Sequence, residues 1–203
     1  MGQVNMDKTN NKAYTERLLI LSESKWKKFF NVQAPYRWNL RRLRLGYTLD
    51  IGCGIGRNLA NLDGHGVGVD HNSASIDICR QRGFKAYESK EFFEVFARAH
   101  YFDTILLSHV VEHMTFDEAV ILLQSYLPFL KSEGRIILIA PQKFGFLSDP
   151  THVEFFDRFK LELLLQRVGF SAQISMSFPL PEIAGSIFKY NEFCVVGSKK
   201  DPV

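Results

Sequence analysis

The sequence predicts an α/β fold in which seven short strands form a mostly parallel sheet with helices on both faces. Short apolar runs alternate with stretches of helical periodicity along most of the chain. This alternation is typical of parallel strands joined by right-handed helical crossovers. Residues 105–107 and 136–140 are apolar throughout, as central strands buried on both faces should be. A helical extension is expected to precede the first strand.

Composition favours a single domain without a strong charge bias. The 203 residues are 46% hydrophobic, which is enough to close one core. The 25 basic and 22 acidic side chains leave a net charge of +3, too small to predict a nucleic-acid or membrane surface. The charge excludes neither partner by itself. A nucleic-acid partner is not expected because the sequence shows no recognised RNA module, and membrane insertion is not expected because no apolar run approaches membrane-spanning length.

The spacing of the cysteines and the polarity of the first residues indicate which cellular compartment to expect. Cys53, Cys79 and Cys194 lie far apart and show no spacing typical of a zinc site or a disulfide framework. No apolar run has the length of a signal-peptide core or of a membrane span. A reducing, cytoplasmic location is the expectation that follows.

Three parts are expected along the chain. Residues 1–11 are rich in Asn, Lys and Gln and would bury too little apolar surface to become ordered, so they predict a loose tail. Residues 12–45 predict a helical cap, with an amphipathic helix over 14–30, a stop at Pro35 and a second helix over 36–44. Residues 46–203 would form the main domain.

Strands and helices of that domain can be placed from local signals. The expected strands are 48–51, 66–69, 84–87, 102–107, 135–140, 172–178 and 192–198. Thr115 and Glu118 form a capping-box pattern that predicts a helix start. Asp157 is a plausible N-cap for a later helix, and Gly169 supplies its left-handed stop.

A glycine-rich segment, LDIGCGIGRNL at residues 49–59, connects the first strand to a helix. Gly52, Gly54 and Gly56 alternate there, and only glycine lets the backbone turn sharply and approach a ligand without a Cβ clash. The second expected strand ends at Asp70, 20 residues after Asp50 (70 − 50 = 20). This gap matches the spacing expected of a carboxylate that binds a ribose.

Together the segments LDIGCGIG, GVD and FDTI, at residues 49–56, 68–70 and 102–105, resemble the ordered motifs of class I S-adenosylmethionine (SAM)-dependent methyltransferases. The resemblance covers about residues 48–198. It implies a Rossmann-like, doubly wound fold, SAM as co-substrate and methyl transfer as the activity. The closest pattern is that of small-molecule and glycan O-methyltransferases.

The resemblance also implies which residues contact SAM. Main-chain groups of the glycine-rich loop would contact the methionyl part, Asp50 would attract its amino group, and Asp70 would hold the ribose. His71 would lie against the adenine, and Glu88 matches a position that contacts the adenine edge. The full expected set is Asp50, Gly52, Cys53, Gly54, Gly56, Asp70, His71, Glu88, Ser108 and His109.

A dinucleotide dehydrogenase is the main competing interpretation of the loop. The spacing of Gly52, Gly54 and Gly56 is not the GxGxxG spacing of that class. Asp50 also argues against it, because a carboxylate beside the loop would repel a pyrophosphate and attract an amino group.

The segment after the fourth strand, SHVVEHM at residues 108–114, is similar to the Glu-His signature of many small-molecule and glycan methyltransferases. In ubiquinone-biosynthesis and small-RNA 2′-O-methyltransferases, a Glu-His pair joins further ligands around a divalent metal. Ser108 stands where we expect the earlier glutamate, so we predict no metal here. Glu112, His113 and His152 would be the ligands if one bound. If no metal binds, Glu112 is expected to cap the following helix or to form a salt bridge with it.

The loop 142–156 is longer and more aromatic than a crossover requires, and its position suits an acceptor pocket. Its phenylalanines are expected to serve core or lid packing rather than substrate contact. His152 and His113 are the candidate acid–base residues for O-methylation of a hydroxyl on a sugar, glycan precursor or other small metabolite. The alternatives are an RNA or protein methyltransferase and a non-catalytic SAM-binding regulatory subunit. Oligomeric state is left open.

Overall fold

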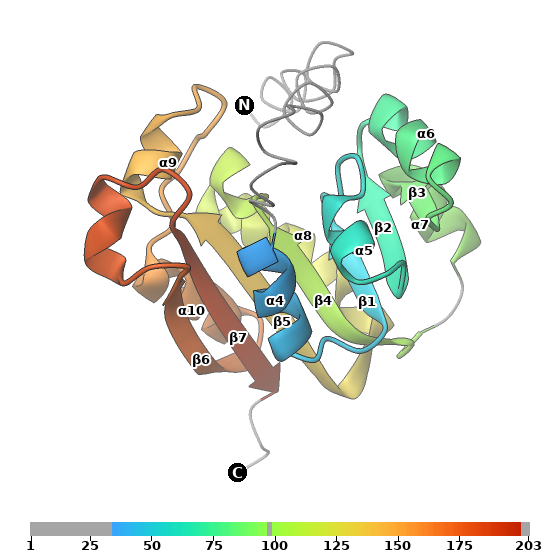
Figure 1. Ribbon diagram of the computed structural model, residues 1–203. Helices are drawn as coiled ribbons and strands as arrows, with labels where there is room; N and C mark the ends of the chain where they lie inside the picture. Colours follow the sequence, from blue (N-terminus) through green and yellow to red (C-terminus); the bar gives the residue numbers. More distant parts are fainter. Residues whose placement is uncertain (1–33, 97–98, 200–203) are drawn as a thin grey trace. The chain divides into compact units, whose positions relative to one another are not determined.

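The computed structural model describes residues 34–96 and 99–199 (Figure 1). The expected tail and the expected helix over 14–30 lie outside these residues. Within the described part, no helix is long and apolar enough to cross a membrane.

Seven strands form one sheet in the order β3-β2-β1-β4-β5-β7-β6. Pairs β1–β2, β2–β3 and β4–β5 are parallel, whereas β7 runs antiparallel to both β5 and β6. The mostly parallel, Rossmann-like sheet expected from the sequence is confirmed. The chain divides into two compact units, one ending near residue 97 and one beginning near residue 98.

The first unit alternates helices and short parallel strands. Its elements are α4 (Ala34–Arg42), β1 (Thr48–Ile51), α5 (Arg57–Asn61), β2 (Gly66–Asp70), α6 (Ser73–Gln81), β3 (Ala86–Glu88) and α7 (Ser89–Val95). Both β1 and β2 are buried along their whole length. Helix α6 begins where the Asn72 side chain accepts a hydrogen bond from the main-chain N–H of Ser75. It buries Ile76 and Cys79 against Ala86 of β3.

The second unit contains the longer strands. Its elements are β4 (Phe102–Ser108), η1 (Val111–His113), α8 (Phe116–Tyr126), η2 (Leu127–Phe129), β5 (Leu130–Pro141), α9 (Lys143–Leu147), α10 (Arg158–Arg167), β6 (Phe170–Phe178), η3 (Glu182–Ser186) and β7 (Glu192–Lys199), where η marks a 3₁₀ turn. Helix α10 packs on β6 and β7 and buries Leu161, Leu164 and Leu165 there.

The expected caps of this unit are confirmed. Thr115 and Glu118 form both hydrogen bonds of a capping box at the start of α8. The Asp157 side chain accepts a hydrogen bond from the Lys160 main chain at the start of α10. Gly169 follows that helix with a φ of +88°, the left-handed conformation expected for a glycine stop.

Several elements differ from the expectation in their bounds: β3 spans Ala86–Glu88 rather than 84–87, and β6 begins at Phe170 rather than 172. Strand β5 begins at Leu130 rather than 135. Leu130 pairs with Phe102, and regular pairing resumes at Arg135 after a register shift, so the exposed polar residues 131–133 gave no strand pattern in the sequence. Helix α4 spans Ala34–Arg42 where 36–44 was expected, so Pro35 belongs to this helix.

Candidate functional site

The glycine-rich loop leaves β1 and enters α5 with a backbone that requires glycine. Gly52, Gly54 and Gly56 have φ values of +71°, +52° and +80°, all in the left-handed region. A Cβ on Gly56 would lie 2.9 Å from the Phe84 ring and 3.0 Å from Cys79 Sγ. Gly56 therefore also allows the start of α5 to approach Cys79 of α6 and Phe84 after it.

Asp50 is buried beside this loop with an incompletely satisfied carboxylate. Its Oδ1 accepts a hydrogen bond from Asn58 Nδ2 at 3.3 Å, and its Oδ2 has no hydrogen-bond partner within residues 34–96 and 99–199. Burial raises the pKa of Asp50 to about 7, although the Asn58 hydrogen bond and the charge of Arg57 oppose the rise. A bound ammonium group would complete this environment.

Asp70, the last residue of β2, ties that strand to the loop. Its carboxylate accepts hydrogen bonds from the Gly54 main chain at 2.8 Å and from the Asn72 main chain at 2.9 Å. His71 lies beside it, with Nδ1 at 3.4 Å from Asp70 Oδ1. The structure thus brings Asp70 and the loop together, and the predicted ribose contact would be made by a carboxylate already held in place.

Two of the expected SAM contacts have structural roles. Cys53 is buried, and a hydrogen bond with Cys79, together with burial, raises the pKa of its thiol. The Glu88 side chain is the N-cap of α7, where it and Glu91 form a capping box. An adenine contact at residue 88 stays a prediction, and it would fall to the main chain while the side chain caps the helix.

The second unit places Ser108 at the buried end of β4 and His109 directly after it with a φ of +60°. Both ring nitrogens of His109 are engaged: Nδ1 donates to Glu112 Oε1 at 3.2 Å, and Nε2 donates to Glu192 Oε1 at 2.7 Å. Burial would lower the pKa of His109, but the charge of Glu192 and the hydrogen bonds to both carboxylates raise it to about 9. The predicted SAM contact of His109 could therefore involve only its ring face or its main chain.

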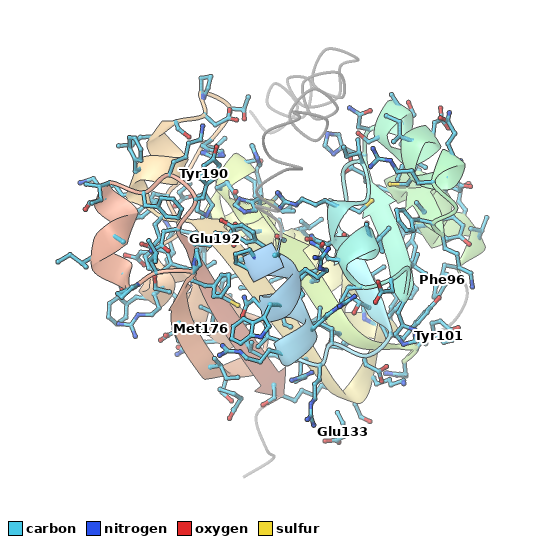
Figure 2. All side chains as sticks on the ribbon, in the orientation of Figure 1. Phe96, Tyr101, Glu133, Met176, Tyr190 and Glu192 are labelled. Atoms are coloured by element: carbon cyan, nitrogen blue, oxygen red, sulfur yellow. The ribbon has the colours of Figure 1, made fainter. Side chains whose placement is uncertain are left out.

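Glu192 is a site residue that the sequence analysis missed. It is the first residue of β7, where it pairs with Phe178 of β6, and it is labelled in Figure 2. A distance of 83 residues along the chain separates it from His109. No local pattern marks such a pair, because it forms only when β7 joins the sheet.

Glu112 is fully buried, at 0% exposure, in the turn η1. Burial would raise the pKa of Glu112, but the hydrogen bond and charge of His109 lower it below the usual value, so the group is ionised. The expected ion pair exists, but with His109 rather than with the following helix, whose cap is Thr115. The second oxygen, Oε2, has no hydrogen-bond partner in the described part of the chain.

The two predicted acid–base residues lie together beside Glu112. The rings of His113 and His152 are 4.9 Å apart at their centroids. Burial lowers the pKa of His113, with the charge of Glu112 opposing this, so its imidazole is neutral near pH 7. One atom each of Glu112, His113 and His152 lies within 4.8 Å of the others, a set that can hold a metal ion.

The aromatic loop before α10 holds His152 in this cluster. The main-chain N–H groups of Val153 and Glu154 donate to the Glu112 carbonyl, at 2.7 and 3.3 Å. Phe146 stacks on the His152 ring with centroids 5.2 Å apart, and Phe155 contacts Phe146 edge-on. Phe146 and Phe155 thus pack beside His152, and Phe156 is buried against Phe116 of α8, as expected for packing residues. Phe144 differs, because 45% of its surface is exposed.

A family described as "Methyltransferase domain" matches residues 23–173. Comparison with curated proteins gave no match.

Solved structures share the fold at low identity. A SAM-dependent methyltransferase from Archaeoglobus fulgidus has a TM-score of 0.66 and 21% identity, over 85% of this chain and 97% of that one. The magnesium protoporphyrin IX methyltransferase of Synechocystis PCC 6803 with bound SAH, the demethylated form of SAM, has a TM-score of 0.66 and 14% identity, over 98% and 100%. A possible histamine N-methyltransferase from Thermotoga maritima has a TM-score of 0.65 and 18% identity, over 89% and 97%.

These likenesses agree with the mostly parallel sheet and with the glycine-rich loop between β1 and α5. The family match covers well over half of the 203 residues. The chain therefore belongs to the methyltransferase domain family and is a class I SAM-dependent methyltransferase.

Proposed function

We propose that this enzyme transfers the methyl group of SAM to a hydroxyl of a sugar, a glycan precursor or another small metabolite. The observation that carries the proposal is the pairing of two histidines, His113 and His152, with the buried, ionised Glu112. A hydroxyl is a weak nucleophile until its proton is removed. A neutral imidazole beside a carboxylate suits that task, because the carboxylate stabilises the imidazolium that forms.

In the proposed reaction, the acceptor oxygen attacks the methyl carbon and the carbon–sulfur bond breaks. The sulfonium of SAM becomes the neutral thioether of SAH, and the hydroxyl proton leaves to His113 or His152. Alignment of the two substrates can supply about 7 to 11 kcal/mol of the rate enhancement. The catalytic residues would add about 100- to 10,000-fold.

On the donor side, we propose that Asp50 pairs with the amino group of SAM and that Asp70 binds the ribose. The unpartnered Oδ2 of Asp50 supports the first role, since a buried carboxylate oxygen gains most from a cationic partner. The hydrogen bonds that hold Asp70 support the second, because they fix its carboxylate before SAM binds. We also propose the cytoplasm as the location, on the grounds that no disulfide joins the three cysteines among the described residues.

The test is methyl transfer from SAM with a ¹³C-labelled methyl group to a panel of sugars, nucleotide sugars and small phenols. We expect the label on oxygen in the product. Because one structural neighbour is described as a possible histamine N-methyltransferase, histamine belongs in the panel. Label found only on nitrogen or carbon would contradict O-methylation.

The roles of the two histidines are tested with His113→Gln and His152→Gln on the best acceptor. Each variant should lose about 100-fold or more in kcat, because removal of an acid–base group costs that much. His65→Gln is the control, since His65 is exposed and packs edge-on against Tyr47. Unchanged kcat in both cluster variants would remove these residues from the mechanism.

A further inference from the structure

We propose that Glu112, His113 and His152 bind a divalent transition-metal ion, and that Glu192, acting through His109, is a positioning residue that keeps Glu112 in place as a ligand. This inference revises the metal-free expectation from the sequence. It rests on the arrangement of five side chains within the second unit, and it goes beyond the proposed methyl transfer.

The first observation concerns a carboxylate oxygen of Glu112. The side chain is fully buried, and Oε2 has no hydrogen-bond partner among the described residues. A buried carboxylate oxygen without a donor costs free energy, on the order of 1 to 3 kcal/mol or more for a charged group. A cation at Oε2 would remove that cost.

The second step is the tautomer of the two histidines. His113 Nδ1 lies 3.3 Å from the Thr151 carbonyl oxygen, and His152 Nδ1 lies 2.7 Å from the Phe146 carbonyl oxygen. A carbonyl can only accept, so each Nδ1 carries the proton and each Nε2 keeps its lone pair. A carbonyl on the far nitrogen is the usual way in which proteins orient a metal-binding histidine.

The third step is distance and donor type. The ligand atoms of the three groups lie within 4.8 Å of one another. Ligands at about 2.0 to 2.2 Å in a tetrahedral zinc site lie about 3.3 Å apart, so small side-chain rotations would close the set. Two imidazoles and one carboxylate suit zinc, manganese or iron, and they leave a further coordination position open.

The fourth step is the support behind Glu112. His109 Nδ1 donates a hydrogen bond to Glu112 Oε1 at 3.2 Å, which leaves Oε2 available to a metal ion shared with the two histidines. His109 is itself held by Glu192 at 2.7 Å, in the first position of β7. The neighbouring Asn191 is fully buried and donates to Gln142 Oε1, so this end of β7 is fixed by further hydrogen bonds. The hydrogen bonds that link Glu192 to His109 and His109 to Glu112 thus fix the orientation of the Glu112 carboxylate.

One consequence concerns the proposed reaction. With a cation bound, His113 and His152 would be ligands rather than proton acceptors, and the hydroxyl proton would leave to solvent water, because a bound cation lowers the pKa of an oxygen ligand. The open position would take the hydroxyl oxygen.

The test is Zn²⁺ and Mn²⁺ binding to the full chain, freed of metal by a chelator and followed by calorimetry. We expect one ion per chain. Glu112→Gln and His152→Gln should each weaken Zn²⁺ binding about 100-fold or more, and Glu192→Gln should weaken it about 10- to 100-fold through the lost support of His109. Glu182→Gln and His65→Gln are matched controls on exposed residues and should bind Zn²⁺ as the natural chain does.

Co²⁺ supplies a second readout, because its visible spectrum reports the coordination number directly. The proposal expects bands of a four- or five-coordinate ion that are lost in His152→Gln. Absence of Zn²⁺ and Mn²⁺ binding, or equal binding by the natural chain, Glu112→Gln and His152→Gln, would overturn it. Binding that is insensitive to Glu192→Gln would overturn the positioning role. None of these measurements involves methyl transfer, so their failure is separable from failure of the proposed function.

Discussion

At the scale of single residues, the charge state of Asp50 couples SAM binding to pH. Burial raises the pKa of this carboxyl to about 7, so below that pH the free protein holds it protonated. An ammonium partner favours the ionised form and would lower the pKa in the complex. Binding must therefore release a proton at acid pH.

The expected result is an affinity for SAH that rises about tenfold per pH unit below pH 7 and levels off above it. Calorimetry in two buffers of different ionisation enthalpy measures both the affinity and the released proton. Asp50→Asn removes the titrating group, and this variant should bind more weakly with a flat profile. A flat profile in the natural chain would show that Asp50 does not meet the amino group.

Asp70 is the second carboxylate whose contribution can be measured separately. Asp70→Ala removes the proposed ribose contacts and also the acceptor of two main-chain hydrogen bonds that hold the loop. We expect SAH to bind about 10- to 100-fold more weakly, which corresponds to about 1.4 to 2.8 kcal/mol. Asp77→Ala, on the exposed side of α6, is the control. Equal affinities of the two variants would contradict the role of Asp70.

At the scale of elements, the capping box at the start of helix α8 contributes to the stability of the protein, and this contribution can be measured. The Thr115 hydroxyl donates to Glu118 Oε2 at 2.8 Å and accepts from the Glu118 main chain at 3.4 Å. Thr115→Ala removes both bonds and should lower the free energy of unfolding by about 1 kcal/mol. Urea unfolding measures the change, with Ser125→Ala in the exposed part of α8 as the comparison. No loss in Thr115→Ala would mean that packing alone holds this end.

Elements with a local signal could be predicted from the sequence, and those without one could not. The caps at Thr115 and Asp157 and the strand 48–51 were predicted because each depends on residues within a few positions. The first part of β5 was missed because residues 131–133 are polar and exposed and lie at a register shift, with only Leu130 paired, to Phe102, ahead of Arg135.

At the scale of the whole molecule, the candidate site also has one part that a continuous segment of sequence marks and one part that only the fold brings together. The SAM-binding loop is continuous in sequence, so its glycines and the spacing to Asp70 could be predicted. The cluster of the second unit joins residues 109–113, 152 and 192, which meet only through the fold. The resemblance grouped Glu112, His113 and His152 as possible metal ligands, but no local pattern could show that His152 contacts His113 or that Glu192 holds His109.

The most direct test of the account is titration of the full chain with SAH, with NAD⁺ as the comparison ligand. We expect one SAH per chain and no measurable heat with NAD⁺, because Asp50 beside the glycine-rich loop favours an amino group over a pyrophosphate. No binding of SAH, or binding of NAD⁺ in its place, would contradict the assignment of this loop as the SAM site.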